Sequence, residues 1–599
     1  MSSTRNSPPL FVSASPEPSA SLGSGSGVQL LLLSGLILFL ELAIIRWGGA
    51  KVRVLAYFPN LLLIGSFLGL GLGCMRSGYP KLSEWWMPLF LLLVASYAGL
   101  GKVIFTQSSG EEHLWLLYYD LGESAPVIDN VWLPVVGCFI LVVIAFIPAG
   151  QMVADRLVEF KRAGRALGGY GWDLAGAMLG AVGFAAIAFA QLSPFHWMLI
   201  GVLGTAWFAR KTSRHLISHL ICGGLAIAIV HFSETSERYS PYYGLALKEI
   251  TNDQPGTKSV AVLANGSLHQ IPIQTDLENP YWPKSARGYH LPYTLSGHQP
   301  RRALVLGAGT GNDVATLLQE GATQVDVVEI DPVIIQLGRE VHPNHPYDSP
   351  RVRIFNTDAR AFLNDNRERY DTIVFGTLDS MTRLSALSNV RLDNFVYSLD
   401  ALRAAASHLT DDGALILYFM SPGNFIDDRI NAMLAQVFQR APVVHTEHFG
   451  LFRQIYMAGP AFAHINPPHR QVWQDAMDQG AIDFTRLDLP NDDWPFLYLA
   501  DRSLSSFYWL IIAWITGLTL VGVFVCSPDL RQSVRRREGM DVPMFCFGLG
   551  FLLLETRAVT AMNLVWGSTW LTSAVVFAAI LLTVFIGTLT FARWPVRLV

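Results

Sequence analysis

The sequence predicts an α-helical membrane bundle of about ten spans with one inserted α/β domain. Three observations carry this prediction. Of the 599 residues, 51% are hydrophobic and only 15% are charged, whereas about 25% of residues are charged in ordinary soluble domains. Apolar stretches long enough to cross a bilayer, about 17–25 residues, gather towards the two ends of the chain. Between about 240 and 500, charged residues, turns and alternating strand and helix patterns return.

Seven candidate spans precede the soluble region and three follow it. They lie near residues 28–46, 59–75, 86–105, 131–150, 170–191, 195–209, 215–232, 506–526, 542–563 and 571–592. Residues 1–27 are rich in Ser, Pro and Gly, and we expect a disordered tail there. A signal peptide is not expected, because the apolar stretch that follows is too long and lacks a small-residue cleavage site. The predicted domains are therefore 1–27, 28–232, 240–500 and 506–592.

Loop charges predict an orientation in the membrane. The loops 155–165, 210–214 and 529–539 are basic, whereas the acidic loop 106–130 contains no Lys or Arg. Placing the basic loops in the cytoplasm puts both termini there and the 240–500 domain outside. We therefore expect an integral protein of a bacterial-type inner membrane. The lipid bilayer is its expected partner, and other membrane protein subunits are possible further partners.

Charged residues also lie within the apolar spans: Glu41, Arg46, Asp173, Glu555 and Arg557. Buried charges in lipid are costly and are usually paired. One interpretation is a transport or proton path. The other is internal ion pairs that lock the helices together, and the sequence leaves both open.

Nucleic acid and metal are not predicted partners. The net charge is −4, and "RQSVRRRE" is the only marked basic run, which argues against a nucleic-acid surface. The five cysteines show no metal-ligand or disulfide spacing. His342 and His345 have HxxH spacing but lack an acidic third ligand nearby, so no metal site is predicted.

The clearest chemistry lies in "RRALVLGAGTGNDVATLLQEGATQVDVVEIDP", residues 301–332. A strand over 303–306 is followed by Gly307, Gly309 and Gly311, then by a helix from about 313 to 319 and a second strand over 325–328. Glycines in such a turn let the backbone approach a ligand closely. Glu329, at the end of the second strand, can accept hydrogen bonds from two ribose hydroxyls. This pattern predicts a nucleoside-binding site.

The spacing and the next strand favour one class of nucleoside. GxGxG, rather than GxGxxG, is typical of S-adenosylmethionine binders more than of NAD binders. The strand in "RVRIFNTDARAFL" ends before Asp358 and Ala359. Asp358 is a candidate contact for the adenine amino group, or the N-cap of a helix that begins at Ala359. Both roles can hold together.

The remaining segments complete a sheet. A fourth strand in "RYDTIVFGTLDS" (369–380), a helix over 398–408, a fifth strand over 411–419, a further helix and a closing strand pair follow in order. This succession predicts a Rossmann-like, methyltransferase-type domain. A small β hairpin region around "NGSLHQ" (265–270) precedes it.

Residues 255–460 resemble the spermidine synthase family of aminopropyltransferases. The hairpin "NGSLHQ" is similar to the family's "DGxxQ", with Gln270 as its last residue, and Tyr289-His290-Leu291 is similar to "YHE". The family's "GGGDGG" becomes "LGAGTGND" here, whereas its "EID" is present as Glu329-Ile330-Asp331 and its "DA" as Asp358-Ala359. The flanking spans and "NDDWPFLYL" (491–499) look like the membrane-embedded branch of the family. The resemblance implies binding of S-adenosylmethionine or decarboxylated S-adenosylmethionine.

Two departures bear on the reaction. The family takes the proton from its amine substrate with the first Asp of a "DxxD" loop after the fourth strand. Gly376 stands at that position here, and Asp379 stands at the second. Leu291 replaces a further acid. Because a polyamine site needs carboxylates to offset its charges, the nucleoside half of the site is kept better than the amine half.

Three functions remain open. The first is a membrane-anchored transferase that passes an aminopropyl or methyl group to a non-standard acceptor, with Asp379, Tyr289 or His290 supplying base or orientation. The second is a catalytically silent domain that serves as a structural or accessory subunit of a membrane complex. The third is a transporter, which only the spans and their buried charges favour.

Overall fold

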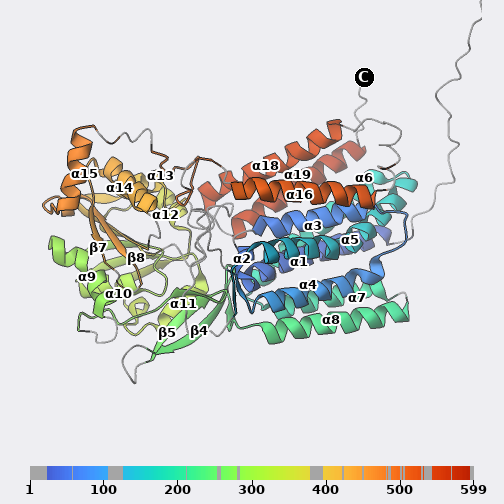
Figure 1. Cartoon of the computed structure of the whole chain (residues 1–599), viewed down its shortest axis with the longest axis horizontal. Coiled ribbons are helices and arrows are strands. Elements are labelled where there is room, and N and C mark those ends of the chain that lie inside the picture. Colours follow the sequence, from blue (N-terminus) through green and yellow to red (C-terminus); the bar gives the residue numbers. More distant parts are fainter. Residues whose placement is uncertain are drawn as a thin grey trace, which may run out of the picture.

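The computed structural model places a helical bundle at one end of the molecule and an α/β domain at the other (Figure 1). The described residues are 23, 25–56, 59–105, 126–210, 212–251, 258–278, 283–377, 395–420, 424–447, 449, 451–480, 482, 487–499, 502–503, 506–527, 531, 542–567 and 570–593.

Each predicted span coincides with a described helix of the bundle. These helices are α1 (Ser26–Lys51), α3 (Pro59–Cys74), α4 (Trp86–Leu100), α5 (Trp132–Arg162), α6 (Ala166–Phe189), α7 (Pro194–Ala209), α8 (Ser213–Ser233), α16 (Ser506–Cys526), α18 (Val542–Trp566) and α19 (Trp570–Arg593). Within the described residues, six helices are long and apolar enough to cross a membrane by length and composition, namely α1, α5, α6, α8 and most of α16 and α18. Leu61–Cys74, Pro194–Ala209 and Val575–Phe591 are shorter apolar helices.

Two boundaries in the bundle differ from the prediction. Helix α5 continues to Arg162, so most of the basic segment 155–165 is helical rather than a loop. Its polar last turns can extend the helix because their hydrogen bonds are internal to it. Helix α4 ends at Leu100, and Ile104–Phe105 forms the short strand β1, which pairs with β2 (Val127–Ile128).

Two of the charged residues within the bundle are held by hydroxyl groups. Ser66 on α3 donates to Glu41 on α1, and Ser34 on α1 donates to Asp173 on α6 at 2.5 Å. Among the described residues Glu41 and Asp173 form no ion pair, so the ion-pair interpretation has no support at these two positions. A short hydroxyl donor satisfies a buried carboxyl without bringing a second charge into the apolar interior.

The small sheet preceding the α/β domain has the strand order β3-β4-β5-β6. Its strands are β3 (Arg238–Tyr239), β4 (Gly244–Thr251), β5 (Lys258–Ala264) and β6 (Ser267–Gln270). The β5–β6 turn contains Asn265 and Gly266, both with positive φ (49° and 75°). Asn-Gly is the preferred pair for such a two-residue hairpin turn, and the turn directs β6 so that the strand ends at Gln270.

The seven-stranded sheet has the order β12-β13-β11-β10-β7-β8-β9. Its strands are β7 (Arg302–Leu306), β8 (Gln324–Val328), β9 (Val352–Phe355), β10 (Tyr370–Phe375), β11 (Leu409–Phe419), β12 (Val443–Thr446) and β13 (Gln454–Ala458). Strands β7 to β11 are parallel, and β13 is antiparallel to both of its neighbours. This arrangement confirms the predicted methyltransferase-type sheet.

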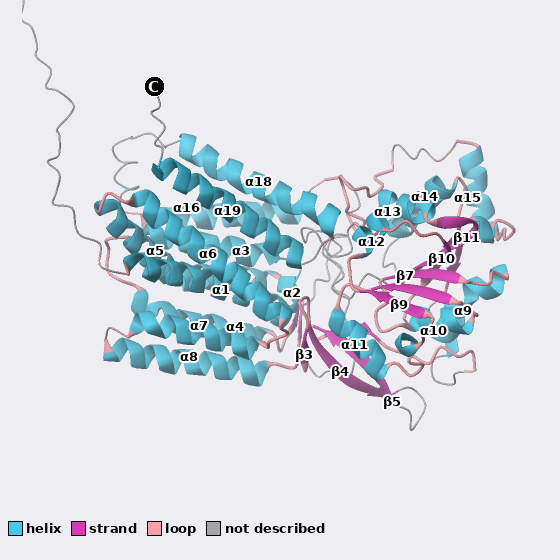
Figure 2. Ribbon diagram, turned by 180° about the vertical axis from the view of Figure 1, so that it is seen from behind, coloured by secondary structure: helices cyan, strands magenta, loops and turns pink. Residues whose placement is uncertain are grey.

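Helices cover both faces of this sheet (Figure 2). On one face are α9 (Pro283–Ser296), α10 (Asn312–Gln319) and α11 (Pro332–Val341), and on the other are α12 (Ala359–Asp365), α13 (Leu399–Ser407), α14 (Asn424–Phe438) and α15 (Pro468–Asp478). Side chains alternate accordingly along β7. Ala303 and Val305 enter the core beneath α9 and α10, whereas Leu304 and Leu306 enter the core with α13 and α14, as the two-residue period of a strand requires.

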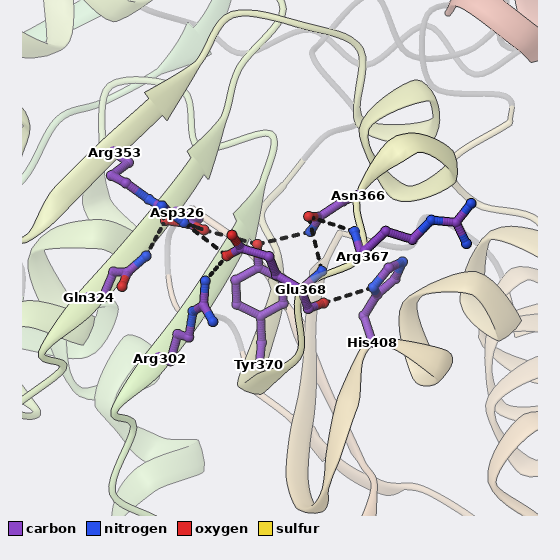
Figure 3. A network of polar contacts seen from close by, with 9 residues as sticks. All are labelled: Arg302, Gln324, Asp326, Arg353, Asn366, Arg367, Glu368, Tyr370 and His408. Carbon is purple, nitrogen blue, oxygen red and sulfur yellow. Dashed lines mark hydrogen bonds and ion pairs between the residues drawn. The ribbon is translucent and has the colours of Figure 1, made fainter.

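A network of polar side chains ties together the amino-terminal parts of four parallel strands (Figure 3). Asp326 on β8 is fully buried. It accepts hydrogen bonds from Arg353 at 2.8 and 2.5 Å and from the Tyr370 hydroxyl at 2.9 Å. Glu368 joins Arg302 to Arg353. The network fixes one edge of the sheet, while the opposite edge, where these strands end, faces the bundle.

Candidate nucleoside site at the bundle-facing edge of the sheet

The Gly-rich loop follows β7 directly and turns into α10. Gly307, Gly309 and Gly311 have φ of 69°, 56° and 109°, a left-handed backbone that side chains other than glycine rarely adopt. The Gly307 amide donates to the carbonyl of Val328 at 2.8 Å, which ties the loop to the end of β8. All three predicted glycines therefore lie together in one tight loop.

Gln270 closes this loop from the small sheet. Its Oε1 accepts a hydrogen bond from the Thr310 amide at 2.8 Å. A Cβ built on Gly309 would lie 2.2 Å from the same oxygen. The absence of a side chain at Gly309 is what lets β6 approach so closely and brings the predicted site residue Gln270 to the loop.

Glu329 follows β8 and lies beneath the same loop. Its Oε2 accepts from the Gly309 amide at 2.9 Å and its Oε1 from the Asp331 amide at 3.0 Å. Burial raises the pKa of Glu329 to about 7, although these backbone donors oppose the shift. Each carboxylate oxygen retains lone pairs that can accept a further hydrogen bond, so the group is suited to a diol.

Asp358 follows β9 and caps α12. Its Oδ1 accepts from the amides of Arg360 at 2.9 Å and Ala361 at 3.0 Å. The N-cap interpretation is therefore confirmed, while the contact with adenine stays a prediction. Ala359 is the first residue of α12 and is buried against the core that contains α13 and α14.

Tyr289 and His290 are neighbours on α9, but they lie at opposite ends of α10. Tyr289 is buried, and its hydroxyl accepts from Asn312 Nδ2 at 3.3 Å, beside the loop. His290 contacts Glu320 through Nδ1, and its Nε2 lies 2.9 Å from the Thr275 carbonyl oxygen. Burial alone would lower the pKa of His290, but Glu320 and the carbonyl outweigh it and raise that pKa.

The structure thus brings Tyr289 to the loop and His290 to the far end of α10. Because both ring nitrogens of His290 have partners, the catalytic role predicted for His290 has no geometric support here. Asp379, the other predicted catalytic residue, lies outside the described residues. Gly376, three residues before Asp379, is among the described residues and is buried.

The sequence interpretation missed two residues of the site. Asp313, the second residue of α10, is buried, and its Oδ1 has no hydrogen-bond partner among the described residues. Tyr242 lies in the link between β3 and β4. Burial, followed by the charges of Asp331, Asp358 and Glu329, raises its pKa. An acid in the first turn of a helix is ordinarily explained by the helix dipole, and no motif contains Tyr242, so neither residue gave a distinct signal.

Asp331 connects the site to the bundle. Ser240, in the same link as Tyr242, donates to Asp331 Oδ2 at 2.5 Å. The carbonyl of Ser240 in turn accepts from Arg46, near the end of α1. The acidic residues that follow β8 are therefore connected to a bundle helix by one serine.

The domain is similar to known aminopropyltransferases. Residues 289–431 match the Spermine/spermidine synthase domain family. A "Polyamine aminopropyltransferase 2" of Bacillus cereus is 30% identical over 132 residues, 21% of this chain and 34% of that protein. A "Polyamine aminopropyltransferase" of Oceanobacillus iheyensis is 25% identical over 287 residues, 42% of this chain and 51% of that protein. These findings confirm the resemblance to the spermidine synthase family for this part of the chain.

The matches are partial. The chain spans between 34% and 51% of the length of these two curated relatives. Among solved structures, a spermidine synthase in complex with the transition state analogue AdoDATO is 12% identical and covers 45% of this chain and 85% of its own, with a TM-score of 0.28. The spermidine synthase of Thermotoga maritima is 13% identical and covers 44% and 82%, also with a TM-score of 0.28. Because these TM-scores are low, the description of the fold depends on the strand order alone and not on the two solved structures.

Proposed function

We propose that the chain is a membrane-anchored transferase that binds S-adenosylmethionine or its decarboxylated form and passes an aminopropyl or methyl group to an acceptor other than a standard polyamine. The observation that carries the proposal is the convergence of Gln270, Gly309 and Glu329 where β6, β7 and β8 end. Ligands of open α/β sheets bind at this edge. The spermidine synthase resemblance covers residues 289–431, which include Gly309 and Glu329.

The residues present fit a nucleoside with a charged sulfur. Glu329 offers a buried carboxylate for the ribose hydroxyls, and Asp358 stands at the end of the neighbouring strand for the base. The donor would supply a carbon made electrophilic by sulfonium. What this chain provides is binding and orientation of that donor by the loop and by Gln270, together with a buried surrounding that limits water.

Two positions support an unusual acceptor. Leu291 stands where the resemblance implies an acid, and Gly376 stands where it implies the base. A di- or tri-cationic polyamine would lose both carboxylates at this site. An acceptor with a single amine, or one of lower charge, fits the remaining acids better because buried cations need paired anions.

Apolar surface supports the membrane anchor. Large apolar side chains are exposed along α16 and α18, among them Trp509, Leu520, Val521, Leu553 and Leu554. Surface of this kind is costly in water and is suited to lipid tails. The loop charges further favour an orientation with the α/β domain outside the cytoplasm, and a reporter fused within that domain tests this placement.

Binding of the donor is the decisive measurement. Titration calorimetry of the full detergent-solubilised chain with S-adenosylmethionine, decarboxylated S-adenosylmethionine and NAD is expected to give affinity for one of the first two and none for NAD. The Glu329→Gln variant is expected to weaken that binding about tenfold or more, since it removes a charge-assisted acceptor. The matched control Glu447→Gln changes an acid that pairs with Arg287 on α9, and none of its described contacts is with Gly307, Gly309 or Gly311.

A silent accessory subunit is the second candidate, and Gly376 is the observation that favours it. If the chain binds neither donor, the transferase proposal fails and the result supports the accessory role. If it binds a donor but releases no thioether product with any amine offered, the site is a binding module, and co-purification of a second membrane protein becomes the relevant measurement.

A further inference from the structure

The position of the missing acid is closed to a side chain. Gly376 follows β10, and its amide donates to the Leu306 carbonyl at 3.0 Å. A Cβ on Gly376 would lie 2.5 Å from the Gly307 carbonyl oxygen, closer than real Cβ contacts allow. An aspartate therefore does not fit here without displacing the Gly-rich loop, so a replacement acid would have to reach this place from another element.

Asp313 reaches it from α10. Its Oδ2 lies 3.3 Å from the position that a Cβ of residue 376 would occupy. Only 7% of Asp313 is exposed. Its Oδ1 is buried and has no hydrogen-bond partner among the described residues. A buried carboxylate oxygen left unpaired costs free energy in the folded protein, which is the mark of a group that awaits a ligand.

The charge of Asp313 acts on tyrosines from three elements. Its charge raises the pKa of Tyr289 and Tyr293 on α9, after burial as the first cause. It does the same for Tyr347, in the short helix Pro346–Asp348, and for Tyr418 on β11. In the described part of the chain no Lys or Arg forms an ion pair with it. A buried anion without a paired cation suits a small cationic group.

We infer that the Asp313 carboxylate replaces the acid missing at Gly376: it faces the cationic reacting centre and accepts the proton that the attacking amine releases. The inference rests on the proposed transferase function. In that step the amine nitrogen forms a bond to the carbon next to sulfonium, and the carbon–sulfur bond breaks. Its electron pair stays on sulfur, giving a neutral thioether, and the amine proton passes to Asp313 and then to water.

The ionisation of Asp313 is compatible with this role. Burial raises the pKa of Asp313 to about 7, although its own backbone amide opposes the shift. A general base works best when its pKa lies near the working pH. A carboxyl that ionises near neutrality is half available as a base and readily gives the proton up again.

The experiment compares a cationic ligand with its neutral counterpart. S-adenosylmethionine and S-adenosylhomocysteine differ by one methyl group and by the sulfonium charge, as do their decarboxylated forms. Calorimetry on the full solubilised chain is expected to show tighter binding of the cation. In Asp313→Asn this preference should fall about tenfold to a hundredfold, the range of one charge-assisted contact, while affinity for the neutral thioether stays unchanged. The control Asp475→Asn, on exposed α15, should keep the preference.

The outcomes separate the two proposals. If the wild-type chain binds neither ligand, the transferase proposal fails. If it binds both and Asp313→Asn keeps the full preference for the cation, the inference about Asp313 is overturned. Should Asp313→Asn fold poorly, the wild-type chain suffices: its preference for the cation should grow as the pH rises from 6 to 8, and a flat profile contradicts the inference.

Discussion

The backbone of Gly567 lies against the side chain of Asp358. A Cβ built on Gly567 would be 2.2 Å from Asp358 Cβ and 3.1 Å from its Oδ1. Gly567 directly follows α18 and has φ of 86°, and Asn364 on α12 also donates to the Leu564 carbonyl at 3.4 Å. The end of a bundle helix thus touches the residue predicted to contact adenine, so the bundle contributes directly to the edge of the candidate site.

Gly567→Ala is expected to weaken nucleoside binding. The added methyl group must push Asp358 away, and a small displacement of a binding group costs much of its interaction. We expect an affinity loss of about tenfold for S-adenosylhomocysteine, about 1.4 kcal/mol, measured by calorimetry on the solubilised chain. Alanine rarely adopts the positive φ of Gly567, so the substitution should also lower the stability of the chain.

Gly480→Ala is the matched control for that variant. Gly480 also has a positive φ, 67°, but a Cβ there would meet nothing within 4 Å. It should lose similar stability and bind with wild-type affinity. Equal affinities for the two variants would show that Gly567 does not form part of the site.

The pH dependence of binding should reflect Glu329. Since burial raises its pKa to about 7, the carboxylate that we propose accepts from ribose exists fully only above that pH. Affinity for neutral S-adenosylhomocysteine should therefore rise about tenfold between pH 6 and 8. Glu329→Gln should bind weakly at both pH values, and a slope that survives this substitution would assign the titration to another group.

The unliganded chain should respond to pH in the opposite direction. In the unfolded chain Glu329 releases its proton near pH 4.3, whereas the folded chain keeps it until about 7. The folded state therefore binds more protons in that window, and the contribution of Glu329 to stability is lost as the pH rises through it. Melting temperatures of wild type and Glu329→Gln at pH 5 and 8 measure this difference.

Gly376→Ala should destabilise the sheet edge. The methyl group meets the Gly307 carbonyl at 2.5 Å, and overpacking of this kind costs about 1–3 kcal/mol. Gly168→Ala on α6 is the control, because a Cβ there meets nothing within 4 Å. Gly376→Asp should be worse than Gly376→Ala, since its carboxylate would also approach Asp313. A Gly376→Asp variant with wild-type melting and raised transfer activity would contradict both steps.

The Gly-rich segment could be predicted from sequence because local signals agree there. The apolar strands, the glycines and Glu329 are close together in the sequence, so each predicted element supports the prediction of the next. Helix positions in the bundle followed from hydropathy for the same reason. The polar end of α5 was missed because hydropathy marks only the apolar part of a helix, whereas α5 continues past its apolar part to Arg162.

The contacts that complete the site could not be predicted, because they join distant segments. Whether Asp313 is solvated or buried depends on how α9 and Tyr347 pack over the start of α10. Gly567 meets Asp358 only once the last helices fold back on the domain. His290 shows the reverse case: its motif suggests chemistry, while its contacts with Glu320 and Thr275 fix it between two elements.

The Asp326 network should stabilise the α/β domain in a pH-dependent way. Burial alone would raise the pKa of Asp326, but hydrogen bonds from Arg353, Gln324 and Tyr370 hold it below the ordinary value. A lowered pKa means that the folded chain loses this proton more readily than the unfolded chain. The stabilisation is therefore present above about pH 4, the ordinary value for Asp, and is lost as the pH falls through the folded pKa.

Arg353→Met tests this network directly. The Asp326 side chain is fully buried, whereas 47% of the Arg353 side chain is exposed, so water screens part of the interaction. Tyr370 and Gln324 remain as donors. We expect a loss of about 1–3 kcal/mol at pH 7, or a fall of about 2–4 °C in the melting temperature for each kcal/mol. The loss should shrink as the pH falls through the lowered pKa of Asp326, where the carboxylate takes up a proton.

The control is Arg403→Met, which removes an exposed arginine that contacts Asp400 at 3.2 Å on α13. Exposed pairs contribute about 0–1 kcal/mol, so its melting temperature should stay near wild type at every pH. Because the Asp326 network joins the amino-terminal parts of the strands, whereas Glu329 follows the carboxyl end of β8, Arg353→Met should keep its nucleoside affinity at temperatures well below the melting temperature. A variant that loses affinity without losing stability would mean that the network positions the site rather than the sheet.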